Sequence, residues 1–385
     1  MKTITTTEAL AAFCEAAARH AYVTVDTEFL RERTYYSKLC LVQLAYPGDG
    51  EGDAVIVDPL AGGISLDPLY DLFRDENVVK VFHAARQDLE IFWTDAALIP
   101  SPLFDTQVAA MVCGFGEQVG YETLVRKIAK GQIDKSSRFT DWSRRPLTEA
   151  QLKYAQADVT FLREIYEYLA ARLEKSGRAR WVAEEMAVLN DPATYVVEPQ
   201  EAWQRVKTRT SSPRFLAIVR ELARFREDYA QARNVPRNRV FKDDALIELA
   251  STKPRTEKDL SRSRLLLREA RRGPIAEGIL AAVETAMALD NDALPRAPRD
   301  KGQQQVNPAL ADLLRVLLKA RAEAEGVAQK LIATAPDLDA IASGERAVPA
   351  LKGWRREVFG NEALDLCDGK LALSARGSQV ITIPL

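Results

Sequence analysis

The segment Tyr22–Phe29, with the sequence YVTVDTEF, constrains the fold of this chain more than any other stretch. Its β-branched and apolar residues predict a strand, and the strand ends in two carboxylates, Asp26 and Glu28. Because alternate residues of a strand point to one face, both carboxylates are expected on the same side. Two such charges repel, so a fold retains them with a bound cation or with a raised pKa. The alternative is a strand that simply ends in a polar turn, since Asp-x-Glu occurs three times in the chain.

The rest of the first half predicts a mixed sheet covered by helices, because strands come first and then alternate with helices. Further strands are predicted at residues 38–46, 54–58 and 78–83. Helices are predicted in the amphipathic run after Thr7, at residues 66–73, from Ala84, and at 104–113, 121–129, 148–175 and 179–189. We expect Thr7 to precede the first helix as its cap. Thr148 and Gln151 have the spacing of a capping box after an irregular, charged loop at 131–147.

After Pro213 the pattern becomes almost wholly helical and falls into two units. Helices are predicted at residues 215–233, 243–250, 258–272 and 275–289, and then at 310–325, 328–334, 337–342 and 353–366, with a short strand at 378–384. Proline-containing polar segments separate the parts. The expected domains are 1–192, 213–290 and 309–385, joined by linkers at 193–212 and 291–308.

Composition indicates a globular protein of two or three domains. The chain has 385 residues, of which 47% are hydrophobic and 28% charged. No apolar run approaches the roughly 18 residues that span a membrane, so no membrane association is expected. The four cysteines are scattered, which argues against a zinc site or a disulfide framework and favours a reducing cytoplasm. No obligate protein partner is indicated.

Charge is distributed unevenly along the chain. Residues 1–200 contain 21 basic and 30 acidic residues, whereas residues 205–272 contain 19 basic and 9 acidic residues. An acidic part joined to a basic part suggests a cation site in the first and a polyanion partner for the second. Arg237, Arg239 and Lys242 could meet a nucleic-acid backbone, but a solvated surface explains them equally well.

Four acidic residues are candidate metal ligands: Asp26, Glu28, Asp88 and Asp158. Tyr154 precedes Asp158 by four residues, so both lie on one face of the predicted helix. Oxygen ligands suit Mg²⁺ or Mn²⁺, with Zn²⁺ as a further candidate. Two such ions roughly 4 Å apart would hold the attacking and leaving oxygens of an in-line phosphoryl displacement. Tyr154 would orient the attacking water rather than act as a strong base.

Other residues are candidates for substrate contact, each with a structural alternative. They are Thr27, Phe29, Leu30, His83, Trp142, Arg144 and Arg145. A stacking role for Phe29 and Leu30 and a core role are equally favoured. For His83 a satisfied, partly buried ring is the preferred interpretation. The loop residues are favoured as phosphate contacts, with simple packing as the alternative for Trp142.

Three segments carry a resemblance to a known superfamily: VDTEF at 25–29, FHAARQDLEIF at 82–92 and YAQADV at 154–159. In this order they resemble the three exonuclease motifs of the DEDD superfamily, in its tyrosine-bearing branch. The runs EFLRERTYYSKLCLVQLA and DWSRRPLTEAQLKYAQADV resemble the ribonuclease D family in particular. Residues 234–260 are similar to the HRDC domain that follows the nuclease in that family, and LKGWRREVFG at 351–360 suggests a second, divergent copy.

The resemblance implies an α/β RNase H-like exonuclease domain, with a mixed sheet and flanking helices, followed by two all-α HRDC-type domains. It implies two divalent metals and 3′-to-5′ exoribonuclease activity that trims tRNA precursors and other structured RNAs to mononucleotides. By position, Asp26, Glu28, Asp88 and Asp158 match the family's metal ligands and Tyr154 its catalytic tyrosine. Two alternatives stay open: a DNA 3′-5′ exonuclease, and a non-catalytic RNA-binding protein with a vestigial site.

Overall fold

The computed structural model describes residues 2–48, 50, 52–137, 140–210, 212–295 and 306–385. By their internal contacts these residues form two compact units. The first comprises Met1–Glu28, Leu39–Thr194 and Gln303–Leu385, and the second comprises Phe29–Lys38 and Tyr195–Gly302. Residues 296–305 of the predicted linker 291–308 lie outside the described residues.

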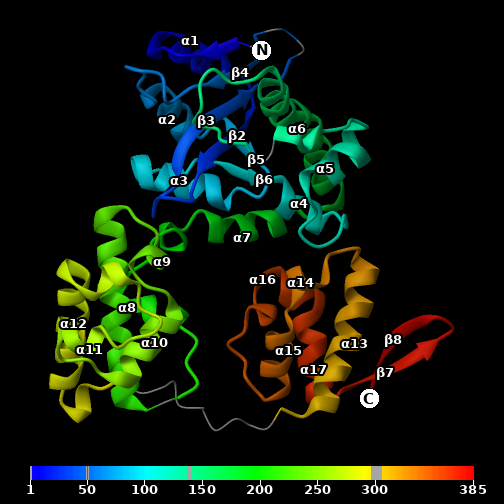
Figure 1. Ribbon diagram of the computed structural model, residues 1–385. Coiled ribbons are helices and arrows are strands. Elements are labelled where there is room, and N and C mark those ends of the chain that lie inside the picture. Colours follow the sequence, from blue (N-terminus) through cyan, green and yellow to red (C-terminus); the bar gives the residue numbers. More distant parts are fainter. Residues whose placement is uncertain (1, 49, 51, 138–139, 211, 296–305) are drawn as a thin grey trace. The chain divides into compact units, whose positions relative to one another are not determined.

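The predicted mixed sheet is the centre of the first unit (Figure 1). Its strands are β1 (Lys2–Ile4), β2 (Tyr22–Leu30), β3 (Lys38–Ala45), β4 (Ala54–Val57), β5 (Val79–Phe82) and β6 (Leu103–Asp105). Their order across the sheet is β1-β4-β3-β2-β5-β6. β5 runs parallel to both β2 and β6, whereas β3 and β4 are antiparallel. β2 therefore occupies an interior position, and its residues up to Val25 are buried.

Helices cover the sheet and bury its apolar side chains. They are α1 (Thr7–Ala17), α2 (Asp67–Arg74), α3 (Arg86–Ala96), α4 (Thr106–Val112), α5 (Tyr121–Leu124), the π-helical turn η1 (Val125–Ala129), the short turns η2 (Lys135–Ser137) and η3 (Pro192–Thr194), α6 (Glu149–Ser176) and α7 (Ala179–Leu189). In Figure 1 the sheet lies between α6 and the pair formed by α2 and α3. The long helix α6 packs on the strands through one face, which includes Ala155, Val159 and Leu162.

Several predictions for this unit need correction at element boundaries. The cap of α1 is Thr6, whose hydroxyl accepts the backbone N–H of Ala9, and not Thr7. The strand β1 was not predicted, because three residues are too few for a periodicity to show. The helix predicted at 104–113 is instead β6 followed by α4, since Asp105 caps α4 and ends the helical hydrogen bonding there.

The second unit is a helical bundle around its own core. It contains η4 (Pro199–Arg205), α8 (Pro213–Arg233), α9 (Arg237–Val240), α10 (Asp243–Thr252), α11 (Glu257–Leu260), η5 (Arg268–Arg271), α12 (Gly273–Ala288) and η6 (Asn291–Ala293). Ala202 and Val206, which fall in the predicted linker 193–212, are buried in this core. Their burial makes this stretch part of the bundle's packing.

The helix predicted at 258–272 is wrong over most of its length. Only Glu257–Leu260 is an α-helix, and an irregular segment leads to η5. The backbone of this irregular segment is hydrogen-bonded to side chains instead. The carboxylate of Glu248 accepts the N–H groups of Arg264 and Leu265, and Arg271 donates to the carbonyl of Leu266. These bonds replace the helical ones that periodicity alone predicts.

The C-terminal segment packs against the sheet-containing part of the first unit through α7. It contains α13 (Pro308–Glu325), α14 (Gln329–Ile332), α15 (Ala335–Ala342), η7 (Pro349–Leu351), α16 (Gly353–Arg355), η8 (Arg356–Gly360), α17 (Asn361–Cys367), and the hairpin of β7 (Leu371–Arg376) and β8 (Gln379–Pro384). The ring of Trp354 stacks on that of Trp181 at 4.6 Å and donates its Nε1–H to Glu185. Of the hairpin, only the second strand was predicted.

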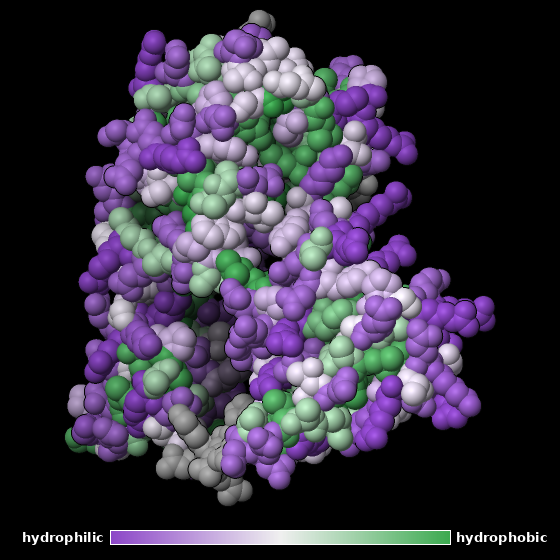
Figure 2. Space-filling model, turned by 90° about the vertical axis from the view of Figure 1, so that its left-hand side faces the viewer, coloured by the Kyte–Doolittle hydropathy of each residue, from purple (hydrophilic) through white to green (hydrophobic). Residues whose placement is uncertain are grey.

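None of the described helices is both long and apolar enough to cross a lipid bilayer. Figure 2 shows hydrophilic residues over most of the viewed face, with apolar residues in scattered groups.

The predicted capping box of α6 is confirmed and gives a stability prediction. The Thr148 hydroxyl accepts the N–H of Gln151, whose amide oxygen accepts the N–H of Thr148. We expect Thr148→Ala to lower the free energy of unfolding by about 1 kcal/mol, because the N–H of Gln151 loses its acceptor. Chemical denaturation measures the change. Thr160→Ala, on the exposed side of the same helix, is the matched control and should stay within about 0.5 kcal/mol.

Candidate active site

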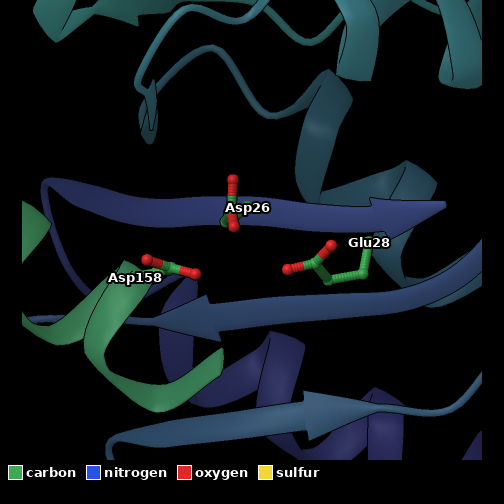
Figure 3. A group of neighbouring side chains, drawn as sticks. All are labelled: Asp26, Glu28 and Asp158. Carbon is green, nitrogen blue, oxygen red and sulfur yellow. The ribbon is translucent and has the colours of Figure 1, made fainter. Parts of the chain in front are cut away.

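Three of the four predicted carboxylate ligands meet in the folded chain. Asp26 and Glu28 project from β2, and Asp158 projects from α6, with their carboxylates turned toward one another (Figure 3). One carboxylate oxygen of each lies within 4.8 Å of the others. Residues more than 130 positions apart in the sequence thus form one oxygen-lined group. Strand spacing predicted one face for Asp26 and Glu28, and the packing of α6 brings Asp158 to them.

A buried threonine holds α6 against β2 beside this group. The hydroxyl of Thr24 donates to the carbonyl of Val159 at 2.9 Å and also lies 3.0 Å from the carbonyl of Ala45 on β3. Two turns further along α6, the hydroxyl of Tyr22 donates to Glu167 at 2.5 Å. Both residues precede Asp26 on β2 at alternate positions, so one strand face is tied to the helix that carries Asp158.

Asp88 lies in the first turn of α3, directly after the tight turn that follows β5. Ala84 adopts a left-handed conformation there, with φ of 58°. The carboxylate of Asp105 supports this turn by accepting the N–H groups of Ala84 and Ala85 at 3.0 and 2.9 Å, and it also accepts the N–H of Gln107. Sequence reasoning missed Asp105 because it lay inside a predicted helix. The available signal was an Asp-Thr pair at the start of an apolar run, which is typical of a helix cap.

Asp88 lies beside the three-carboxylate group and is not a member of it. Its carboxylate accepts a short hydrogen bond from the hydroxyl of Thr27. Thr27, predicted as a substrate contact, is buried and directed at Asp88, so the structure favours a role in positioning that carboxylate. Burial raises the pKa of Asp88 to about 7, against the lowering effect of the Thr27 hydroxyl.

The charge of the site is unfavourable without a cation. The pKa of Asp26 is raised well above its ordinary value, first by burial and then by the negative charges of Asp158, Asp88 and Glu28. Such a carboxylate set can be neutralised by protons or by a cation held between the oxygens. Three oxygen donors converging within 4.8 Å are a donor set that suits a hard divalent cation. The residues present therefore fit a Mg²⁺ or Mn²⁺ site.

Tyr154 lies one helical turn before Asp158 and is half-buried. Its ring is 6.1 Å from that of Trp142. A second tyrosine, Tyr121, was not predicted as part of the site. Its hydroxyl donates to the carbonyls of Ala157 and Asp158, and its pKa is raised by burial and then by the charges of Asp158 and Asp26. Tyr121 fixes the turn of α6 that carries Asp158.

His83 is held by the protein itself. Its Nδ1 lies 3.0 Å from the hydroxyl of Thr106, which donates to the carbonyl of Phe82, and its ring is 5.4 Å from that of Tyr121. Burial lowers the pKa of His83, so the neutral imidazole is favoured. These contacts support the satisfied, partly buried histidine over the proposed contact with substrate.

The three loop candidates differ in what they contact. Trp142 is 2% exposed, which supports the packing alternative for this residue. Arg145 donates to both carboxylate oxygens of Asp58 and to the carbonyls of Trp142 and Cys40. The structure thus favours a structural role for Arg145 over the predicted phosphate contact, because five oxygens, including the carbonyl of Arg144, already accept from its guanidinium. Arg144 is exposed and pairs with Asp141 at 3.4 Å.

Phe29 and Leu30 continue β2 directly after Glu28 and are half-buried. By their contacts they belong to the second unit, together with the loop that follows. Both alternatives for these residues, core packing and contact with bases, stay predictions.

The raised pKa of Asp88 predicts how pH affects the stability of the metal-free protein. A folded-state pKa of about 7, above the ordinary 3.8, means that the folded chain binds this proton more tightly than the unfolded chain. Protonation of Asp88 therefore adds to the free energy of unfolding below about pH 4, and this contribution is lost as the pH rises toward 7. In EDTA-treated protein we expect Asp88→Asn to exceed the wild type in unfolding free energy by a few kcal/mol at pH 8, with the difference vanishing near pH 4.

Denaturant unfolding at several pH values measures this difference. Asp71→Asn changes an exposed carboxylate on α2 and is the matched control. An Asp88→Asn profile that runs parallel to the wild type from pH 4 to 8 would contradict the prediction.

Comparison with known proteins shows which family this chain is similar to. A family model described as 3′-5′ exonuclease matches residues 1–174, and an HRDC domain model matches residues 215–283. The chain is 63% identical to a protein named Ribonuclease D from Jannaschia sp. (strain CCS1), over 98% of both chains. It is 50% identical to a Ribonuclease D from Granulibacter bethesdensis, covering 98% of this chain and 95% of that one.

Among solved structures, the chain is similar to the crystal structure of Escherichia coli RNase D, an exoribonuclease. The TM-score is 0.83 at 31% identity, covering 96% of this chain and 98% of that one. Of the three functions that the sequence left open, these likenesses select RNA 3′-end trimming by hydrolysis. The chain belongs to the ribonuclease D family of 3′-5′ exoribonucleases.

Proposed function

We propose that this exoribonuclease trims the 3′ ends of tRNA precursors and other structured RNAs in the cytoplasm, releasing nucleoside 5′-monophosphates with two divalent metal ions. The observation that carries the proposal is the convergence of Asp26, Glu28 and Asp158 within 4.8 Å, with Asp88 beside them. The similar Escherichia coli RNase D is an exoribonuclease involved in structured RNA processing. The four free cysteines agree with a reducing compartment.

The side chains divide the chemical work by their positions. Asp26, Glu28 and Asp158 would hold the divalent ions, and Asp88 would complete the set. Bound there, two such ions would stabilise the charge that develops on the attacking and leaving oxygens of an in-line displacement. Tyr154, one turn from Asp158 on α6, would donate or accept the hydrogen bond that orients the attacking water. Tyr121 and Thr24 keep that turn of α6 in place.

The second unit supplies a surface suited to the RNA backbone. Residues 205–272 carry 19 basic against 9 acidic residues. Arg262 and Arg264 are exposed on the irregular segment between α11 and η5, and Arg268 is exposed at the start of η5. Salt-dependent, sequence-independent contacts with phosphates are the expected role of such residues. We further propose that residues 309–385, which carry LKGWRREVFG, form a second, divergent HRDC-like domain after the linker.

Replacing one carboxylate of the cluster tests the metal-dependent hydrolysis. We expect Asp26→Asn to lower the rate of mononucleotide release by at least about 100-fold, because the site loses a ligand while its fold is kept. The substrate is a tRNA precursor with a labelled single-stranded 3′ extension, assayed with Mg²⁺, with Mn²⁺ and with EDTA. Asp71→Asn, at an exposed carboxylate, is the control and should behave as the wild type.

Two outcomes would overturn this assignment. One is wild-type trimming by the Asp26→Asn variant. The other is undiminished trimming by the wild type in EDTA. A DNA strand of the same sequence, assayed in parallel, should be degraded much more slowly; equal rates would remove the preference for RNA from the proposal.

Tyr154→Phe tests the orienting role of the phenol separately from metal binding. We expect kcat to fall roughly 10- to 100-fold with little change in the KM for RNA, since the hydroxyl would act on the attacking water and not on substrate affinity. Tyr168→Phe, at an exposed position of α6, is the matched control. An unchanged kcat in Tyr154→Phe would exclude a catalytic phenol.

A further inference from the structure

The strand that carries two of the clustered carboxylates does not end within its own unit. β2 spans Tyr22–Leu30, yet the boundary between the two units falls directly after Glu28. The following segment, Phe29–Lys38, belongs by its contacts to the helical second unit, and the chain returns to the first unit at Leu39 in β3. The loop that joins the carboxylate strand to its sheet neighbour is therefore held by the HRDC unit.

The loop is fixed at its backbone by one asparagine. Oδ1 of Asn234 accepts the N–H groups of both Tyr35 and Tyr36, each at 3.0 Å. Asn234 is the C-cap of α8 in the left-handed conformation, with φ of 49°. Asparagine tolerates this conformation better than most residues, and its side-chain oxygen here bonds the loop instead of its own helix.

The phenol of Tyr35 gives a second anchor deeper in the same unit. Its ring packs on the apolar core of the bundle, and its hydroxyl donates a short hydrogen bond to Glu227. Glu227 is fully buried and also pairs with Arg237 at 3.5 Å. The amide of Gln231 donates to the Tyr35 hydroxyl at 3.2 Å and to the carbonyl of Val197 at 2.8 Å. A buried carboxylate is costly unless hydrogen-bonded, which favours the anchored state of the loop.

We propose that Asn234 and Tyr35 are positioning residues for the active site. By clamping the loop seven residues beyond Glu28, the HRDC unit limits the conformations open to the end of β2 and so holds the Glu28 carboxylate near those of Asp26 and Asp158. This inference rests on the proposed metal site.

The physical basis is the difference between a free and an anchored loop. Ten residues connect Glu28 to Leu39. Without anchors, the loop beyond Leu30 would sample many backbone conformations and loosen the end of β2, and ordering that end would oppose metal binding. The two hydrogen bonds to Asn234 and the half-buried phenol of Tyr35 contribute to this ordering during folding. The affinity of the carboxylates for the cation then rises, because less conformational entropy is lost when the cation binds.

The test compares two glycine substitutions at equivalent helix ends in the full-length protein. Asn234→Gly keeps the left-handed backbone and removes only the oxygen that holds the loop. Lys253→Gly makes the same change at the exposed C-cap of α10, where φ is 51°. Mn²⁺ binding is measured by electron paramagnetic resonance without RNA. We expect the Mn²⁺ dissociation constant to rise roughly tenfold in Asn234→Gly and to stay at the wild-type value in Lys253→Gly.

Asn234→Asp keeps the accepting oxygen and should restore binding to near the wild-type value. Tyr35→Phe removes the second anchor and should weaken Mn²⁺ binding in the same direction. Equal dissociation constants for Asn234→Gly and the wild type, with both proteins folded by circular dichroism, would overturn the clamp.

Asp158→Asn separates the two hypotheses. Loss of Mn²⁺ binding in this variant supports the metal site whatever Asn234→Gly does. Undiminished binding in Asp158→Asn would overturn the metal site itself. If Asp158→Asn loses binding while Asn234→Gly and Tyr35→Phe bind as the wild type does, the clamp alone fails.

Discussion

Repulsion among neighbouring carboxylates is the constraint on which the active site depends. Asp26, Glu28 and Asp158 place oxygens within 4.8 Å of one another, and their charges together with burial raise the pKa of Asp26. A fold gains nothing in stability from such a cluster, so the surrounding structure must hold it together. The rest of the first unit keeps these three carboxylates close together until a cation neutralises them.

Side-chain hydrogen bonds to the backbone do much of this holding. Thr24 ties β2 to α6, Tyr121 ties α5 to the turn of α6 that carries Asp158, and Asp105 supports the turn before Asp88. None of the three is among the clustered carboxylates. Each satisfies backbone or side-chain polar groups that would otherwise be buried without a partner, and each therefore fixes an element at low cost. Arg145 does the same for the loop before α6 by binding Asp58.

Most elements were predictable because their signals are local. The periodicity of β2, the capping box at Thr148 and Gln151, and the helical pattern of the second unit all agree with the structure. The errors fall where partners distant in the sequence decide. Residues 261–267 carry a helical pattern, yet Glu248 and Arg271 hold their backbone in an irregular form. Asp105 lies in an apolar run that predicts a helix. In the structure it ends β6, and its carboxylate accepts the N–H groups of Ala84 and Ala85.

By itself, the sequence determined the identity of the acidic residues, their order, and the face of the strand or helix from which each projects, because those follow from periods of 2 and 3.6 residues. Only the tertiary structure decided which residues share one site. It brought Asp158 to Asp26, directed Thr27 at Asp88, buried Trp142 and paired Arg145 with Asp58. It also gave the loop after Glu28 to the helical unit. The reason is that proximity across the chain depends on packing and on the pairing of buried polar groups, which no local pattern records.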